Sequence, residues 1–116
     1  MSVGTIVQVD AEELSPPVRE HLCRELATFG LAGPDVGGCE VHVERGNARN
    51  GRPLLTVRIE LRHLGCLLAE SQEGEYLFST FRYTCAALRR RLEGSRRLAR
   101  RRRAMVPLGG LAASSA

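Results

Sequence analysis

Arginine is the residue type whose number and placement are most unusual in this chain of 116 residues. The segment from Ala86 to Arg103, AALRRRLEGSRRLARRRR, contains nine arginines and a single acid, Glu93. The guanidinium group is planar, stays charged and binds a phosphate through two parallel hydrogen bonds. Such a cluster is expected to bind a polyanion such as folded RNA, and a solvated helix face or a disordered tail are the alternatives.

The charges are divided unevenly along the chain. Residues 1–81 contain seven arginines and twelve acids, a net charge of −5, whereas residues 82–116 contain ten arginines and one acid, a net charge of +9. The chain has no lysine. A preference for Arg over Lys explains the residue type but not its concentration at one end. This asymmetry is typical of proteins that bind nucleic acid or another acidic surface.

The composition is that of one folded domain. A chain of 116 residues can build a single core, and 43% hydrophobic with 26% charged residues is normal for a globular protein. No apolar run approaches the roughly 18 residues that a membrane span requires, and the N-terminus lacks the pattern of a secretory signal. A cytoplasmic protein with no membrane partner is expected, with its four cysteines reduced.

The hydrophobic pattern predicts the element order β-α-β-β-β-α. Strands are expected over 5–11, 39–45, 54–63 and 66–71, with one helix within 14–30 and another from about residue 75. Apolar and polar residues alternate along the strands, so one face of the sheet is expected to be buried and the other wet. The fold class is therefore α+β, a four-stranded sheet with two helices packed on one face.

The connections between strands predict their register. A two-residue turn at 50–51 would place inward residues of one strand opposite outward residues of the next, so a bulge or an odd loop length is expected there. A three-residue loop over 63–65, with its glycine in the left-handed conformation, is expected to pair Leu61 with Leu67.

The second helix decides where the arginines lie. Its apolar stripe consists of Leu77, Phe78, Phe81, Cys85, Leu88 and Leu92, and the stripe stops before most of the arginines. A helix over 75–103 would be roughly 43 Å long, and the sheet would be only about 23 Å deep. The arginine half is thus expected to reach into solvent, either as a projecting helix or, if Gly94-Ser95 ends the helix, as a flexible arm. A domain over 1–97 and a disordered tail over 98–116, first basic and then rich in small residues, are expected.

Residues 64–92 read LGCLLAESQEGEYLFSTFRYTCAALRRRL, and the first helix begins LSPPVREHL. Over about residues 4–97 the chain resembles the ribosome hibernation-promoting factor and ribosome-associated inhibitor family, once described as sigma-54 modulation proteins. That family reads roughly P-G-x-x-L-x-A, a short acidic spacer, D-x-Y-x-A-I-D and then K-L-x-R-Q-L, with a basic residue at the position of Arg19. Phe78 and Phe81 stand at the Tyr and Ile positions of this pattern, and the matching residues are Gly65, Leu67, Ala69, Leu88, Arg90 and Leu92.

Three positions depart from the family pattern. Tyr76 and Arg82 stand where the signature has acids, and Ala87 replaces a basic residue. The chain resembles the short form of the family, which lacks a second, dimerising domain.

The resemblance implies a fold similar to double-stranded RNA-binding domains and a basic surface that contacts rRNA phosphates. It also implies binding to the small ribosomal subunit in the cleft of messenger and transfer RNA, and a block of translation in stressed, non-growing cells. No catalytic residue, cofactor or small-molecule substrate is implied, and the protein is expected to be a monomer off the ribosome. A general binder of structured RNA and a regulator that binds an acidic protein are the alternatives.

The candidate RNA contacts come mainly from the second helix. Some of its arginines flank the apolar stripe and others lie on the opposite side, and two arginines of the first helix are second-rank candidates. Residues 100–103 are either an arm that enters an RNA channel or a nonspecific tail. The candidates are Arg82, Arg89, Arg90, Arg96, Arg97, Arg100, Arg19 and Arg24.

Metal binding and catalysis are both disfavoured by the sequence. Cys39 and His42, like His63 and Cys66, have the spacing of metal ligands, but Cys39 and His42 lie within one predicted strand, where residues three apart point to opposite faces. The sequence contains neither a Gly-rich phosphate loop nor a nucleophile elbow. It therefore predicts neither a metal site nor an enzyme.

Overall fold

The computed structural model describes residues 5–9, 14–49 and 51–114, with side chains described for 14–46, 51 and 53–104. Its six elements occur in the predicted order, β-α-β-β-β-α. They are β1 (Thr5–Val9), α1 (Pro16–Thr28), β2 (Val36–Arg49), β3 (Arg52–His63), β4 (Cys66–Gly74) and α2 (Leu77–Ser114).

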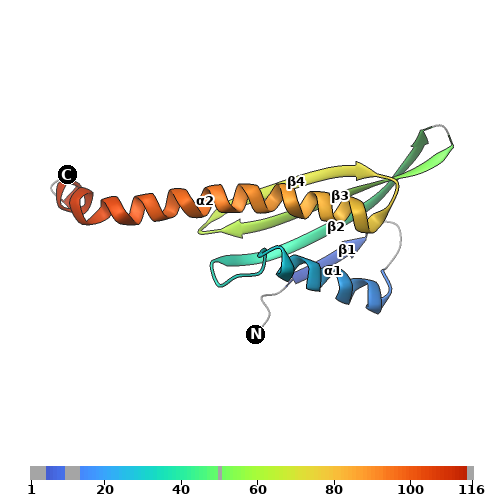
Figure 1. The fold of residues 1–116 in the computed structure, drawn as a ribbon, viewed down its shortest axis with the longest axis horizontal. Coiled ribbons are helices and arrows are strands. Elements are labelled where there is room, and N and C mark those ends of the chain that lie inside the picture. Colours follow the sequence, from blue (N-terminus) through green and yellow to red (C-terminus); the bar gives the residue numbers. More distant parts are fainter. Residues whose placement is uncertain (1–4, 10–13, 50, 115–116) are drawn as a thin grey trace.

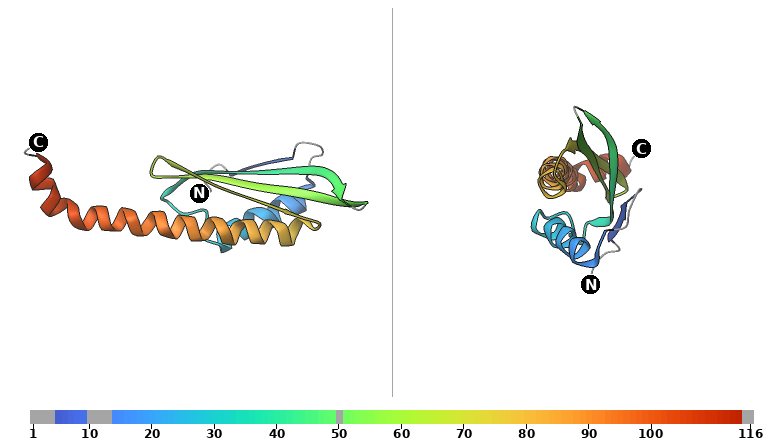
Figure 2. Two further views of the ribbon diagram at one scale, coloured as in Figure 1. Left: turned by 90° about the horizontal axis from the view of Figure 1, so that it is seen from above. Right: turned by 90° about the vertical axis from the view of Figure 1, so that its right-hand side faces the viewer.

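The four strands form one sheet in the order β1-β2-β3-β4, and both helices lie on the same face of it (Figures 1 and 2). This confirms the α+β class and the two-helix layer. The β2-β3 and β3-β4 pairs are antiparallel, whereas β1 runs parallel to β2. The parallel pairing of β1 with β2 follows from α1, because a crossover helix returns the chain to the end of the sheet at which β1 began.

The ends of α1 follow from local chemistry. Ser15 precedes the helix and Pro16 occupies its first turn, where a missing N–H is tolerated. At the other end Gly30 has a φ of 75°, and the Leu31 N–H donates to the Leu26 carbonyl at 2.9 Å. This 6→1 bond is that of a Schellman motif, which ends a helix at a left-handed glycine.

The predicted irregularity between β2 and β3 is confirmed. Arg49 pairs with Arg52 around a turn that contains Gly51, and the register then shifts between Gly46 and Arg49. Beyond the shift Val43 lies opposite Val57, and both side chains are buried. The bulge therefore restores the match between the inward faces of the two strands.

The predicted register between β3 and β4 is wrong by one residue. His63 pairs with Cys66, so the turn contains only Leu64 and Gly65, and Leu61 lies opposite Leu68 instead of Leu67. Leu64 and Gly65 have φ values of 52° and 84°. Positive φ at both positions is the type I′ arrangement, which suits the twist of a hairpin. A one-residue slip exchanges the faces, and Leu67 is accordingly 53% exposed.

The core lies between the helices and the inner face of the sheet. It contains Leu22 and Leu26 of α1 and the larger part of the apolar stripe of α2, and the sheet contributes Val41, Val57 and Ile59. Phe81, Cys85, Leu88 and Leu92 are fully buried, as predicted for the stripe. Phe78 is the exception, because its side chain is 46% exposed.

Helix α2 is 38 residues long, roughly 57 Å at 1.5 Å per residue. It extends far beyond the sheet and makes the protein 63 Å long and 33 Å wide (Figure 1). Gly94-Ser95 does not end it, and residues 98–114, for which a disordered tail was predicted, continue as helix. A domain boundary at residue 97 stays a prediction. Within the described residues, neither helix is long and apolar enough to cross a membrane.

Candidate nucleic-acid interface

The arginines of α2 fall into two groups that the sequence does not distinguish. Six of them are exposed, and their guanidinium groups form neither a hydrogen bond nor an ion pair with any other residue in the described part of the chain. We call these the free arginines. They are Arg90, Arg97, Arg100, Arg101, Arg102 and Arg103.

Two more candidates, Arg82 and Arg89, are exposed but already paired. The Arg82 Nε donates to Glu25 Oε1 of α1 at 2.9 Å, which ties the two helices together. Glu25 is only 8% exposed, so this ion pair neutralises an acid that the fold buries. The Arg89 Nε donates to Glu93 Oε1 at 3.0 Å, one helical turn away. Both guanidinium groups keep further N–H donors for a phosphate.

Arg96 is engaged inside the fold, unlike the other candidates. Its Nε donates to Asp35 Oδ2 at 2.7 Å and its Nη2 to Asp35 Oδ1 at 2.9 Å. These hydrogen bonds, opposed by partial burial, lower the pKa of Asp35 to about 2. The structure thus places Arg96 in a bidentate ion pair, the strongest form of this contact, and not on the free surface.

Asp35 also contacts His63, which is buried on β3. His63 Nε2 lies 2.9 Å from Asp35 Oδ2, and His63 Nδ1 lies 2.6 Å from Ser95 Oγ of α2. A carboxylate can only accept, so the Nε2–H of His63 donates to Asp35, and Nδ1 forms a hydrogen bond with the Ser95 hydroxyl. We call Asp35, His63, Ser95 and Arg96 the Asp35 cluster.

The order serine, histidine, aspartate in this cluster is that of a catalytic triad, but the setting does not suit acyl transfer. Ser95 lies inside α2, where the backbone N–H groups are used by the helix itself. If the Ser95 hydroxyl attacked a carbonyl group, the resulting oxyanion of the substrate would therefore lack the preorganised donors that such chemistry needs. We interpret the cluster as a polar contact that fixes α2 against β3 and the loop before β2.

The two arginines proposed on α1 lie on the helical layer of the molecule. Arg19 is exposed and makes no ion pair with any residue that the structure describes. Arg24 Nη2 lies 3.8 Å from Glu20 Oε2, and both side chains are largely exposed. Pairs of this kind contribute little and leave Arg24 available to a ligand.

Arg91, which was not a candidate, supports the edge of the sheet. Its Nη1 donates to the Ala69 carbonyl at 2.7 Å and to Glu70 Oε2 at 3.0 Å. Because β4 is an edge strand, this contact satisfies a carbonyl that has no neighbouring strand.

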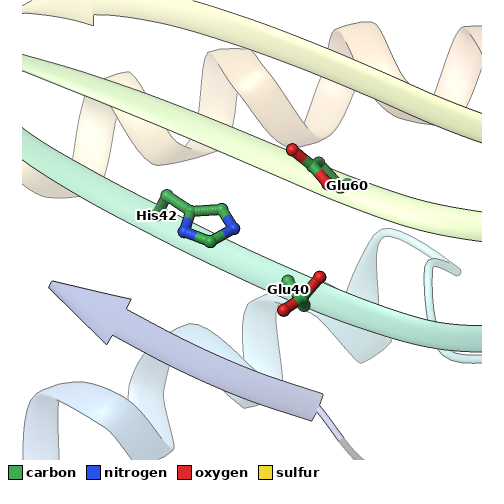
Figure 3. Close-up of side chains that lie close together, drawn as sticks. All are labelled: Glu40, His42 and Glu60. Carbon is green, nitrogen blue, oxygen red and sulfur yellow. The ribbon is translucent and has the colours of Figure 1, made fainter.

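The outer face of the sheet carries three side chains that converge, Glu40, His42 and Glu60 (Figure 3). Their ligand atoms lie within 4.8 Å of one another, because Glu40 and Glu60 are directly paired between β2 and β3. No sequence motif indicated this group, because its members lie on two strands and come together only through the pairing of β2 with β3. The Arg58 Nε donates to Glu60 Oε2 at 2.6 Å and lowers the pKa of Glu60. Arg58 therefore already supplies a cation here, where a metal ion would have to compete with it.

The side chains of Cys39 and His42 in β2 point to opposite faces of the sheet, as predicted. The Cys39 side chain is buried in the core, and burial raises the pKa of its thiol to about 12, whereas His42 lies on the outer face. Cys39 and His42 therefore cannot share a ligand, as the strand geometry predicted.

A cleft of about 910 Å³ lies between α1 and the start of α2. Val18 and His21 line it on one side, and Tyr76, Phe78 and Arg82 on the other. The rings of His21 and Phe78 meet edge to face with centroids 4.8 Å apart. This contact accounts for the exposure of Phe78, which packs against α1 at the rim of the cleft instead of entering the core.

The fold matches solved structures. The chain shares its fold with the N-terminal domain of Protein Y. The N-terminal domain of Thermus thermophilus Protein Y superposes with a TM-score of 0.62 at 13% identity, covering 78% of this chain and 94% of that chain. A ribosomal subunit interface protein from Coxiella burnetii gives a TM-score of 0.65 at 13% identity, covering 79% of this chain and 96% of that one. No protein-family model and no curated protein sequence matches the chain.

These comparisons agree with the fold that the resemblance implied, down to the sheet and its two helices. Nearly all of each solved chain lies within the match, whereas about a fifth of this chain lies outside it. The present chain therefore has the shared fold and additional residues.

Proposed function

We propose that this protein binds the small ribosomal subunit through the arginines of α2, in the cleft that holds messenger and transfer RNA, and blocks translation in non-growing cells. The observation that carries the proposal is the set of six free arginines on one helix of a fold shared with a ribosomal subunit interface protein. Arginines that stabilise the fold have acidic partners within it, as Arg91 and Arg96 do, whereas the free arginines have none among the described residues.

The proposed mechanism is steric and needs no chemical step. The α+β domain occupies the path of the RNA substrates, and guanidinium groups bind rRNA phosphates through bidentate hydrogen bonds. Arg90 and Arg97 supply contacts from the side of α2 that faces away from the sheet, and Arg82 and Arg89 add contacts near α1. In this proposal the protein acts in the cytoplasm, as a monomer off the ribosome, without cofactor or catalysis.

Co-sedimentation with purified small subunits at about 50 and 200 mM salt tests this function. Each lost phosphate contact lowers the slope of log affinity against log salt by about 1, so Arg90→Ala/Arg97→Ala is expected to lower it by about 2. Arg58→Ala/Arg62→Ala removes the same charge from the opposite face of the sheet and is expected to behave like the parent.

A plain RNA duplex run beside the subunits identifies the two alternatives. Equal affinity for duplex and subunits at the higher salt would indicate a general binder of structured RNA. A complex that survives RNase would indicate an acidic protein partner instead. Either result would overturn the ribosomal proposal.

A further inference from the structure

The part of α2 beyond the Asp35 cluster has properties of its own. We call residues 97–103 the arginine arm. Five of its seven residues are arginines, all five are exposed, and no acid occurs after Glu93. The arm begins beside the β3-β4 turn, where α2 leaves the sheet, and α2 continues beyond it to Ser114 (Figure 1).

The arginines of the arm point to all sides of the helix. Successive residues of an α-helix are rotated by about 100°, so the four consecutive arginines from Arg100 to Arg103 span a full turn. Arg97 adds a guanidinium on the side that faces away from the sheet. A flat anionic surface would contact only one side of such a helix and leave the remaining charges without partners.

The base of the arm is held in place. Ser95 and Arg96 bind His63 and Asp35, immediately before the arm begins. A small cavity of about 250 Å³ further along lies between the β3-β4 turn, at Leu64 and Cys66, and the arm. The arm is therefore the continuation of a fixed helix, and its direction relative to the sheet is set by the fold.

We propose that the arginine arm enters, as a helix, a crevice between two phosphate backbones of folded RNA, such as a major groove opened by a bulge. This inference rests on the proposed function and names the shape of RNA that the arm recognises. A helix with side chains is about 10–12 Å wide. The major groove of regular A-form RNA is too narrow and deep for it, and the minor groove is too shallow to surround it.

An acidic protein groove fits the arm less well. Protein interfaces have an apolar centre from which charged residues are depleted. Among the seven residues of the arm the only large apolar side chain is Leu98. Phosphates on both sides of a crevice match arginines on all sides of a helix, and no apolar anchor is required.

The test uses two RNA hairpins of equal length, one with a three-nucleotide bulge and one fully paired, at about 200 mM salt. The parent chain is expected to bind the bulged hairpin at least about tenfold more tightly, because only its groove admits the helix. Replacing Arg100, Arg101, Arg102 and Arg103 by alanine is expected to abolish this preference.

Helix-breaking variants separate a rigid arm from a flexible charged tail. Ala99→Pro keeps every charge but interrupts the helix, and Leu98→Gly/Ala99→Gly loosens it without a steric clash. Both are expected to lose the preference for the bulged hairpin, whereas Ala112→Pro, beyond the arm, is expected to keep it. Circular dichroism and thermal unfolding confirm that the domain remains folded.

The inference fails if the parent binds both hairpins equally, or if the helix-breaking variants retain the preference. It also fails if alanines in the arm change nothing, or if the arm captures an acidic protein after RNase treatment. Failure on the hairpins with intact binding to small subunits leaves the proposed function standing. A preference for the bulged hairpin without binding to small subunits would support the arm as a groove-binding helix and would overturn the ribosomal role.

Discussion

Arg96 and Asp35, 61 residues apart in the chain, form a bidentate ion pair with N–O distances of 2.7 and 2.9 Å. The pair joins α2 to the loop between α1 and β2 just before α2 leaves the sheet. One arginine of the basic segment is thereby part of the fold, and its immediate neighbour Arg97 is exposed to solvent. The structure thus separates two adjacent and chemically identical residues into a structural role and a proposed binding role.

The first prediction uses these neighbours as a matched pair. Arg96→Ala is expected to lower the free energy of unfolding by roughly 2 kcal/mol, because it removes charged hydrogen bonds from a partly buried carboxylate. Arg97→Ala is expected to change it by less than about 0.5 kcal/mol and to weaken RNA binding instead. Urea unfolding and RNA titration of both variants check this. Equal loss of stability in the two variants would contradict the assignment.

The second prediction concerns the pH dependence of stability. The pKa of Asp35 is about 2 in the folded protein, below its ordinary value of 3.8, so its charged form favours folding. That contribution is present above about pH 4 and is lost as the pH falls toward 2, because the unfolded state binds the proton first. Asp35→Asn is expected to cost roughly 2 kcal/mol at pH 7.

The control for this prediction is the pH dependence of the same substitution. The difference in unfolding free energy between Asp35→Asn and the parent is expected to shrink between about pH 4 and pH 2. A difference that stays constant over this range would show that the charge of Asp35 is not what stabilises the cluster.

The third prediction concerns the turn between β3 and β4. Leu64 has a φ of 52°, which is unfavourable for a residue with a side chain of this size, and the side chain is 58% exposed. Leu64→Asn is expected to raise the free energy of unfolding by about 1 kcal/mol, because Asn adopts this conformation more readily. Leu67→Asn removes a similarly exposed leucine from an extended strand and is expected not to stabilise the protein. Thermal unfolding of both variants measures the difference.

The fourth prediction concerns the cysteines. Cys39 and Cys85 are buried, and burial raises the pKa of each thiol to about 12, whereas Cys66 is exposed in β4. Only the thiolate reacts, so alkylation of the native protein at about pH 8 is expected to label Cys66 first. Cys39 and Cys85 are expected to react only after unfolding. Mass spectrometry of labelled peptides identifies the sites, and early labelling of Cys85 would contradict the described core.

The sequence by itself determined the order of the elements, the ends of α1 and the bulge between β2 and β3. These features follow from local signals, namely hydrophobic periodicity, a proline and a glycine at the helix ends, and the need to keep Val43 and Val57 on the same face. It also located the basic segment, because charge asymmetry requires no knowledge of contacts.

The tertiary structure decided the β3-β4 register and the division of the arginines. The register depended on Leu64, which adopts a left-handed conformation that its residue type disfavours. A prediction that allowed only Gly65 to be left-handed therefore gave a strand register that is wrong by one residue. The division depended on acids far along the chain, since Glu25 lies 57 residues before Arg82 and Asp35 lies 61 residues before Arg96. Sequence pattern reports which face a residue occupies, but ion pairs between elements form only when packing brings their partners within a few ångströms.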